Sequence, residues 1–385
     1  MHFLDLPDDI LIEILQLIDG PQPRKFFALS NIRRTCKHLV PLVEPLMFAE
    51  LQVLISISHL PAILLLAGSY GRHVRILRLD LRLDLKEIGY PSDERLHDFD
   101  TELALLVSQL PAVRDLEILV PCDGGILLPN LTYALGEFRE VRHFRLMEEN
   151  SRTRESAAGA VFGLSDGLIR TLIKSSGSNL ISFVFDGHSL ASAAAFQAVC
   201  DQTPRLRTFL VRSWIGPQCS KLLDDALPWA CRDSLRALSL QNCTAVTGDV
   251  VARGLSVKLW ATNLRIFELV QCGVHGAPPV AQSQPVSFNI PTLQRLTLEH
   301  PLAWELDILA KLPARVATLT LIPRENVKQI VQDGLIPGME KLTVAKLSED
   351  DPRDDSAIDD ACRRRGVELF KDPKWIGSCY CGFTE

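Results

Sequence analysis

The sequence predicts an α/β solenoid with parallel strands on its concave face, helices on the outer side, and a group of three helices at the N-terminus. Two observations predict this fold. A short apolar phrase, Leu/Val-x-x-Leu/Phe-x-apolar, recurs along most of the chain, and segments with helical spacing lie between its copies. Self-similarity at a period of roughly 20–30 residues is typical of stacked repeats, in which each repeat contacts only its neighbours.

The N-terminal group begins with a helix expected from Pro7 to Ile18, and two further helices are expected over 26–39 and 40–48. From residue 10 onward only Glu13 and Gln16 of the first helix are polar. An ordinary surface helix has a single apolar stripe, so two different bodies should cover this one. The following helices are the first body. The second is either a partner protein or the first turn of the solenoid.

This region resembles a known family. Leu6–Leu15, with its Leu-Pro-acid-acid start, is similar to the opening of the F-box, Thr35–Leu39 to its second helix and Glu44–Phe48 to its closing segment. The connection from residue 19 to 26 is longer than usual, and Phe48 stands where the family often has Trp. The resemblance implies that residues 1–50 bind the Skp-type adaptor of a cullin–RING ubiquitin ligase. It offers as adaptor-binding residues Leu6, Pro7, Ile10, Leu11, Ile14, Leu15, Cys36, Leu39 and Leu46.

The repeat region is expected over residues 51–373, followed by a tail at 374–385. In each copy of the phrase the fourth and sixth residues share one face of a strand and point into the core, and the third, fifth and seventh point outward. Further strands are expected at Leu51–Ile57 and Val367–Phe370. The copies of the phrase begin at Val74, Val113, Val141, Leu180, Leu206, Leu235, Leu264, Leu293, Val316 and Met339.

Asn242-Cys243 and Cys272 follow strands at the position where leucine-rich repeats carry Asn or Cys. This resemblance implies a leucine-rich-repeat solenoid, with parallel strands joined by outer helices. The segments with helical spacing are Thr101–Leu110, Leu131–Glu140, Ser165–Ser175, Ser189–Asp201, Ser220–Ala230, Gly248–Trp260, Glu305–Lys311, Glu325–Asp333 and Ser356–Arg365. The stretches 86–100, 149–164 and 272–291 are expected to be loops, and the acidic run 348–355 to be solvated surface.

A parallel sheet of this kind displays its outward side chains on a rigid frame, which suits the recognition of a protein. Trp214 and Trp304 lie just past strands and serve either as anchors for a partner or as packing residues. The outward residues taken as target-binding candidates are Arg78, Asp115, Glu117, Arg145, Arg212, Gln241, Glu268 and Arg295.

Composition limits the partners. The chain has 41 Lys and Arg against 47 Asp and Glu and no dense basic block, so a nucleic-acid partner is not expected. The N-terminus lacks the basic residues of a secretory signal, and the ten cysteines are irregularly spaced, which favours reduced thiols in a cytoplasmic or nuclear protein. Leu51–Gly68 is apolar but interrupted by polar residues, so a strand followed by a helix is preferred to a membrane span.

No motif predicts catalysis. The histidines are scattered, no glycine-rich phosphate loop follows a strand, and Cys379 and Cys381 are too few for a metal site. We therefore expect neither a cofactor nor an enzyme, but a receptor whose N-terminal helices bind the ligase adaptor and whose repeats bind a target protein. The alternative is a leucine-rich-repeat scaffold that does not act through a ubiquitin ligase. An enzyme with a site in the 86–100 or 272–291 loops is disfavoured, because these loops lack converging titratable groups.

Overall fold

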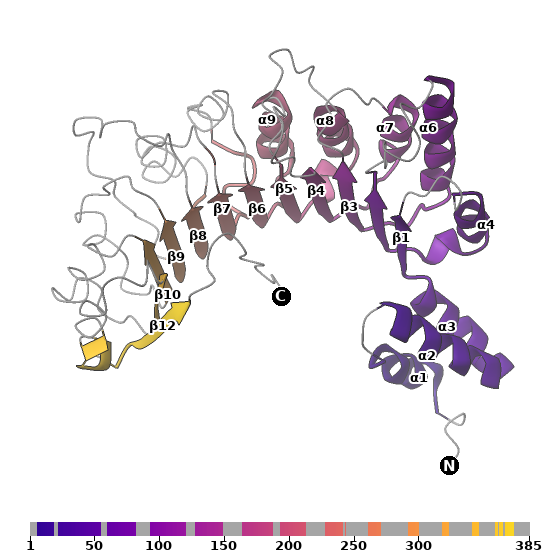
Figure 1. Ribbon diagram of the computed structural model, residues 1–385, viewed down its shortest axis with the longest axis horizontal. Coiled ribbons are helices and arrows are strands. Elements are labelled where there is room, and N and C mark those ends of the chain that lie inside the picture. The colour runs from indigo at the N-terminus through magenta and orange to yellow at the C-terminus, as the bar shows by residue number, and fades with distance from the viewer. Residues whose placement is uncertain are drawn as a thin grey trace. The chain divides into compact units, whose positions relative to one another are not determined.

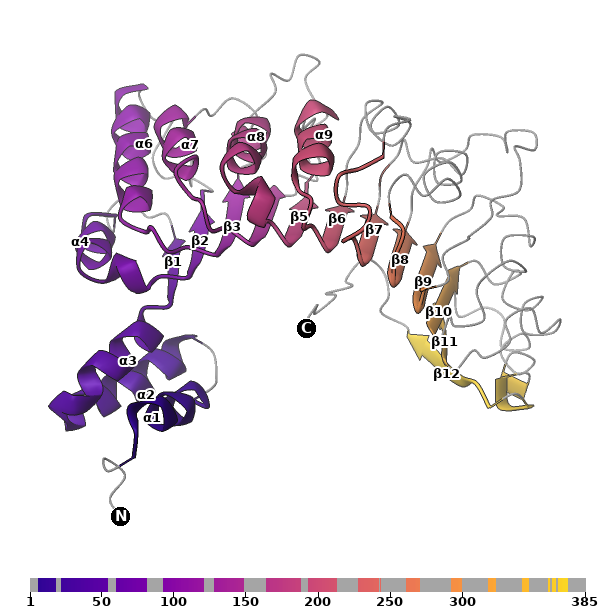
Figure 2. The same ribbon diagram turned by 180° about the vertical axis from the view of Figure 1, so that it is seen from behind.

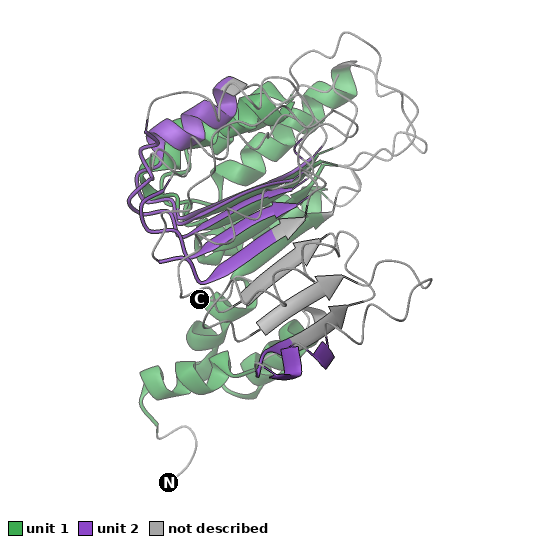
Figure 3. Ribbon diagram, turned by 90° about the vertical axis from the view of Figure 1, so that its left-hand side faces the viewer, with its two compact units in different colours: residues 1–180 green, residues 181–385 purple. Residues whose placement is uncertain are grey.

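The computed structural model describes residues 6–18, 22–54, 60–81, 93–120, 128–148, 164–187, 193–212, 228–241, 243, 261–270, 292–299, 318–322, 341–345, 359–360, 362–364 and 366–372. The chain divides into two compact units, Met1–Leu180 and Ile181–Glu385, which are coloured separately in Figure 3. We call them unit 1 and unit 2 and describe each by itself.

Unit 1 begins with a helical bundle made of α1 (Asp8–Gln16), α2 (Gln22–Thr35), the short 3-10 helix η2 (Lys37–Leu39) and α3 (Val40–Met47). The second helix starts four residues before the expected position at Phe26. Pro23 therefore lies in its first turn, where a missing N–H leaves no helical hydrogen bond unmade. The connection from α1 to α2 is accordingly shorter than the sequence indicated.

The rest of unit 1 alternates strands and helices. Strands β1 to β4 pair in parallel and in sequence order, and α4, α6, α7 and α8 lie on one side of them (Figures 1 and 2). The strands are β1 (Glu50–Leu54), β2 (Ile76–Asp80), β3 (Asp115–Val120) and β4 (His143–Glu148). The helices are α4 (Leu60–Tyr70), η4 (Gly71–His73), α6 (Asp93–Ser108), α7 (Pro129–Leu135), α8 (Leu164–Ser176) and η5 (Gly177–Asn179).

The core of unit 1 follows the alternation that the sequence predicts. In β2 the second and fourth residues, Leu77 and Leu79, are buried, and the same register in β3 holds Leu116 and Ile118. Residues one, three and five of each strand point the other way, and we call the side that carries them the outward face. Alternation thus separates core from surface in this unit.

The bundle joins the repeats through an aromatic contact. Phe48, directly after α3, stacks on Tyr70 at the end of α4 with ring centroids 3.9 Å apart, and Phe26 meets the Phe48 ring edge-on at 6.1 Å. The N–H groups of Arg75 and Ile76 donate to the Ala49 carbonyl, which sets the start of the sheet. The bundle is therefore packed against the first repeat, and Phe48 is part of that junction.

Unit 2 also has parallel strands in sequence order. Each of β5 to β11 pairs with the next strand along the chain, ending at β12. One helix, α9 (Ala193–Gln202), is described in full, and short helical pieces occur at 359–360 and 362–364. The strands are β5 (Ser182–Asp186), β6 (Thr208–Arg212), β7 (Ala237–Gln241), β8 (Ile266–Val270), β9 (Arg295–Glu299), β10 (Thr318–Ile322), β11 (Lys341–Ala345) and β12 (Glu368–Asp372).

The N-terminal part of this core is aromatic. Phe183 and Phe209 occupy matching positions on β5 and β6 and stack at 5.7 Å, while Phe196 of α9 meets Phe185 edge-on at 5.2 Å. Trp229 closes the group against Phe209. All five side chains are at most 2% exposed, so they fix the first repeats of unit 2.

The α/β architecture with a parallel sheet, predicted from the repeated phrase, is confirmed strand by strand, with ends shifted by a few residues. The expectation of a loop up to residue 100 is wrong, because α6 already begins at Asp93. Phe99 and Asp100 are buried in this added stretch and anchor it against the repeat. The helices expected at 248–260, 305–311 and 325–333, the loops at 149–163 and 272–291, the acidic run 348–355 and the tail 374–385 lie outside the described residues.

The apolar stretch considered as a membrane span forms a strand and a helix instead. Residues 50–54 are β1, and α4 has eleven residues, which at 1.5 Å per residue span about 16 Å. Within the described parts of the chain, no helix is both long enough and apolar enough to cross a bilayer.

Candidate interaction surfaces

The bundle has its own buried core. Two leucines of α1, Leu11 and Leu15, pack there with Leu39, and all three are at most 3% exposed. Burial of apolar surface is what holds so small a bundle together. The expectation that these three side chains face an adaptor is therefore corrected: they pack inside the bundle. The other members of this core are Leu29, Val43 and Met47, and Leu6, Cys36 and Leu46 pack partly buried against it.

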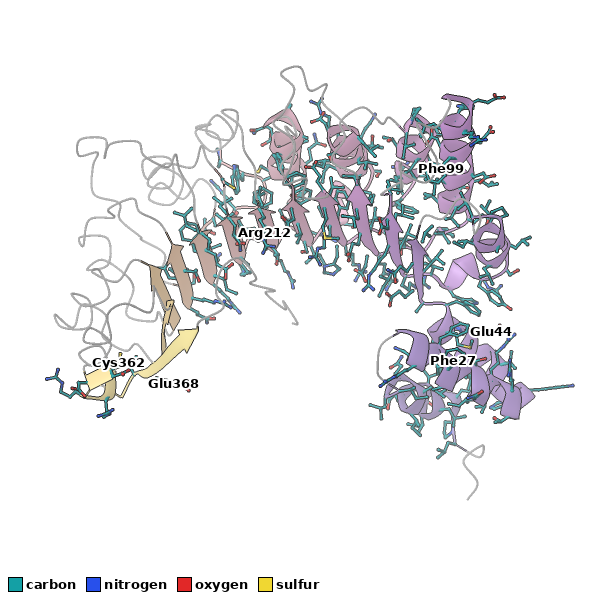
Figure 4. All side chains as sticks on the ribbon, in the orientation of Figure 1. Phe27, Glu44, Phe99, Arg212, Cys362 and Glu368 are labelled. Atoms are coloured by element: carbon teal, nitrogen blue, oxygen red, sulfur yellow. The ribbon has the colours of Figure 1, made fainter. Side chains whose placement is uncertain are left out.

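A second face of α1 stays open. Ile10 and Ile14 are 38% and 37% exposed, and Leu17, which follows the helix, is 80% exposed. The spacing i, i+4, i+7 places the three on one stripe. Phe27 of α2 adds an aromatic side chain that is 68% exposed, and Figure 4 shows it on the bundle. We call Pro7, Ile10, Ile14, Leu17 and Phe27 the apolar patch of the bundle.

The apolar patch overlaps only in part with the residues expected from the sequence to bind an adaptor. Leu17 and Phe27 were not among the expected adaptor-binding residues, although Leu17 lies seven residues after Ile10. Polar contacts brace the helices beneath the patch. Arg33 donates to Glu44 at 2.6 Å between α2 and α3, and the His38 imidazole lies 3.0 Å from the Asp8 carboxylate. The patch is thus carried on a bundle whose helices are tied to one another.

The outward face of unit 1 carries a half-exposed row of charges. Arg78 forms ion pairs with Glu50 and, at 3.6 Å, with Glu117, so adjacent strands alternate in sign. Arg145 continues the row at the register of Glu117, and in the described part of the chain its buried Nε has no hydrogen-bond partner. Opposite charges in register stabilise a sheet modestly and leave the guanidinium groups accessible to solvent.

Asp115 begins the third strand of this face and pairs with His143 across to β4 at 3.9 Å. Partial burial raises the pKa of the Asp115 carboxyl above its ordinary value, and the positive charges of His143, Arg114 and Arg142 oppose that rise. The four candidates of unit 1, namely Arg78, Asp115, Glu117 and Arg145, therefore lie together on one partly open surface.

The outward face of unit 2 is organised differently. Arg212 bonds to the Asp186 carboxylate at 3.0 Å and to the Gln241 side-chain oxygen at 2.9 Å. The network continues through Ser239 to Glu268, whose carboxylate accepts from the Ser239 hydroxyl at 2.9 Å. Arg295 closes it at 3.4 Å from Glu268. A chain of polar contacts thus runs from β5 to β9; Figure 4 labels Arg212 within it.

The centre of this network is buried. Gln241 is 5% exposed and Glu268 only 1%, and Leu210 on the same face is buried as well. Strands β6 to β8 are therefore buried on both faces, as is common for parallel sheets. The expectation that Gln241 and Glu268 are displayed to a target is corrected, whereas Arg212 and Arg295 keep part of their surface. The sequence does contain a sign of this burial, because the outward positions Leu210, Ser239 and Thr297 hold short or apolar side chains.

The cysteines act as structural groups where they are described. The Cys243 thiol, after β7, lies 3.3 Å from the Gln241 carbonyl and 3.7 Å from that of Val211, at the position where leucine-rich repeats place Asn or Cys. Burial raises the pKa of the Cys231 thiol to about 12 and that of Cys200 well above its ordinary value. Such thiols stay protonated and are poor nucleophiles. Cys272, Cys379, Cys381, Trp214 and Trp304 lie outside the described residues.

Among the described residues, no group of three or more His, Cys, Asp or Glu side chains is arranged to hold a metal ion. The described side chains instead form an apolar patch on the bundle, a charged row on the outward face of unit 1 and a largely buried polar network on unit 2.

Comparison with known proteins adds little. No protein-family profile matches the chain, and no curated protein sequence matches it significantly. The crystal structure of the leucine-rich repeat-containing protein LegL7 from Legionella pneumophila is similar at 15% identity and a TM-score of 0.39, over 83% of this chain and 89% of that chain. Function is therefore argued from the residues themselves.

Proposed function

We propose that this chain is the substrate-recognition subunit of an SCF-type ubiquitin ligase. In this proposal the bundle is an F-box that binds a Skp-type adaptor, and the leucine-rich-repeat-like array binds a target protein. The observation that supports it most is the apolar patch. A bundle of this size already has a core, so the exposed Ile10, Ile14, Leu17 and Phe27 are surplus to its packing and suit a partner.

The resemblance of Leu6–Leu15 to the F-box gives that partner its identity within the proposal. The helix is apolar nearly all round because its two faces serve two purposes. Leu11 and Leu15 pack inward, and Ile10 and Ile14 remain for the adaptor. Exposed aromatic side chains such as Phe27 are enriched in protein interfaces.

The array would supply the target-binding end. The charged row Arg78, Glu117 and Arg145 on unit 1 is rigidly held on paired strands and partly open, which suits recognition of a protein. No bond chemistry is assigned to the chain. Its contribution would be to keep a target close to the ubiquitin-loaded enzyme and so raise its effective concentration there.

Co-purification with a Skp-type adaptor tests the first half of the proposal. Ile10→Asp combined with Ile14→Asp places two charges in the apolar patch without entering the bundle core, and should reduce adaptor capture at least about tenfold, since each buried aliphatic group contributes roughly 1.5–3 kcal/mol. Gln16→Asp on the same helix is the matched control and should bind like wild type. Leu15→Asp is unsuitable, because Leu15 is buried and its loss would unfold the bundle.

The outcomes separate the two functions considered. Failure of the wild-type chain to bind the adaptor, or equal binding by the double variant, overturns the proposal. Adaptor binding without cullin recruitment would instead favour a repeat-protein scaffold that works outside a ubiquitin ligase. Capture of partners with the ligase inactivated would then show whether a target accumulates on the array.

A further inference from the structure

Arginine recurs at one position of the repeat. The residue directly before the strand is arginine in β2, β3 and β4 of unit 1 and again in β6, β7 and β8 of unit 2. It is the second residue of the repeated phrase, which neither the core pattern nor the outward alternation requires to be basic. These residues are Arg75, Arg114, Arg142, Arg207, Arg236 and Arg265.

In unit 2 the backbone aligns three of them. The Arg236 N–H donates to the Arg207 carbonyl at 2.8 Å, and the Arg265 N–H donates to the Arg236 carbonyl at 2.7 Å. Consecutive members therefore stand one strand spacing apart, about 4.8 Å. We call Arg207, Arg236 and Arg265 the arginine column.

The column is largely open to solvent. Arg207 and Arg265 are exposed and Arg236 is half-buried. Arg236 donates to the Asp233 and Leu235 carbonyls, and in the described part of the chain Arg265 makes no side-chain hydrogen bond or ion pair. Stacked like charges repel one another, so the fold itself gains nothing from them.

The turns beside the column add more positive charge. Arg205 and Arg232 are exposed there, and over 203–207, 230–236 and 261–265 five arginines lie with one acidic residue, Asp233, which pairs with Arg232 at 3.8 Å. Asp201 lies close enough to Cys231 to act on its thiol, so it is the second acidic residue of this region. In unit 1 the equivalent arginines are partly compensated, since Arg114 lies 3.6 Å from Glu140. The described turns beside the column thus carry more basic than acidic residues, on a chain whose net charge is −6.

We propose that the arginine column of unit 2 binds an acidic, carboxylate-rich segment of a protein partner. Guanidinium groups pair with carboxylates through two parallel N–H bonds, which makes arginine suited to this recognition. In the context of the proposed function that partner is the target, so the column would define the target as acidic at its docking segment.

Single-stranded nucleic acid is the other polyanion to consider. Proteins that bind it combine basic grooves with aromatic side chains on which bases stack. Trp229, the aromatic residue of the described turns beside the column, is only 2% exposed and packs on Phe209, so it offers no face on which a base could stack. The observations therefore favour an acidic polypeptide.

The test uses the full-length chain and a fluorescent peptide of eight glutamates between glycines, followed by anisotropy. Arg236→Gln with Arg265→Gln should weaken binding about tenfold, because two charge-assisted hydrogen-bond donors are lost. Arg363→Gln with Arg364→Gln removes the same charge from an exposed site elsewhere in unit 2 and should leave affinity within about twofold. Wild-type affinity should also fall as salt rises.

An equal loss of peptide affinity in both double variants would show that only overall charge matters and would overturn the proposal. Tighter binding of an oligothymidylate of the same charge than of the peptide would also overturn it. Arg265→Gln alone serves as a second variant, since its side chain makes no hydrogen bond or ion pair with the described residues. The peptide assay contains no adaptor, so its result stands apart from adaptor capture: either proposal can fail while the other holds.

Discussion

The two units use the same outward positions of their strands in opposite ways. In unit 1 these positions hold Arg78, Glu117 and Arg145, which are half-exposed and alternate in charge. In unit 2 the equivalent positions hold Ser239, Glu268 and Thr297, none more than 2% exposed. Side chains on the outward face of unit 1 can therefore be substituted with little effect on the fold, whereas those on the outward face of unit 2 are part of the packed interior.

The buried polar groups show the same division. In unit 1 Asp100, Ser165 and Ser176 lie in the helical layer, away from the sheet. In unit 2 most of them lie on β7, β8 and β9. A repeat array can therefore bury its polar groups either in the helical layer or on the outward face of its strands. Only the first arrangement leaves the outward face accessible to solvent.

The largest expected difference between the units follows from truncating one glutamate in each. Glu268→Ala leaves the Ser239 hydroxyl and Arg295 without their shared acceptor in a buried setting, which should cost about 2 kcal/mol. Glu117→Ala removes a half-exposed ion pair with Arg78 and should cost at most about 0.5 kcal/mol. Urea unfolding followed by circular dichroism measures both.

Equal costs in this pair of variants would show that the buried network of unit 2 is no more structural than the row of unit 1. Glu268→Gln refines the result, because an amide oxygen can still accept from Ser239. It should recover part of the loss.

A smaller effect is expected from the buried carboxylate of the unit 1 helical layer. Asp100 accepts from the Asn130 and Leu131 N–H groups at 2.9 and 2.8 Å. It therefore caps α7 from a neighbouring helix, while Leu128 at the N-cap position offers no side-chain acceptor. Asp100→Ala should cost about 1.5 kcal/mol, as for other lost helix caps.

Asp98→Ala is the matched control for that cap, since Asp98 lies exposed on the same helix. Thermal unfolding should separate the two variants by several degrees. Coincident melting curves would mean that α7 does not depend on this cap.

The sequence predicted the strands well because period-two alternation is local. In β2 and β7, leucines two positions apart, Leu77 and Leu79 or Leu238 and Leu240, are enough to assign the buried side of the strand. The same alternation could not tell that Glu268 is buried and Glu117 is not. It assigns a direction to a side chain, whereas exposure depends on what packs over that face.

Within the bundle, the prediction of which apolar side chains are exposed was wrong for a related reason. A helix that is apolar nearly all round has no pattern that distinguishes Leu11, which packs inward, from Ile10, which does not. The early start of α6 was missed because Asp100 is fixed by hydrogen bonds from α7, about thirty residues away. The local spacing of apolar residues does not predict contacts between segments that are far apart in the sequence.

The smallest effect concerns pH and returns to the open face of unit 1. Partial burial raises the pKa of Asp115, so the folded chain holds this proton more tightly than the unfolded chain. Its contribution favours folding at a pH below the ordinary pKa of the group and is lost as pH rises through the raised pKa.

Asp115→Asn removes this dependence of stability on pH. The stability of wild type relative to the variant should therefore decline between about pH 4 and 6, by at most about 0.5 kcal/mol because the group is partly exposed. Urea midpoints across that range measure it, and a wild type that gained stability relative to the variant as pH rises would show instead that the ion pair with His143 outweighs burial.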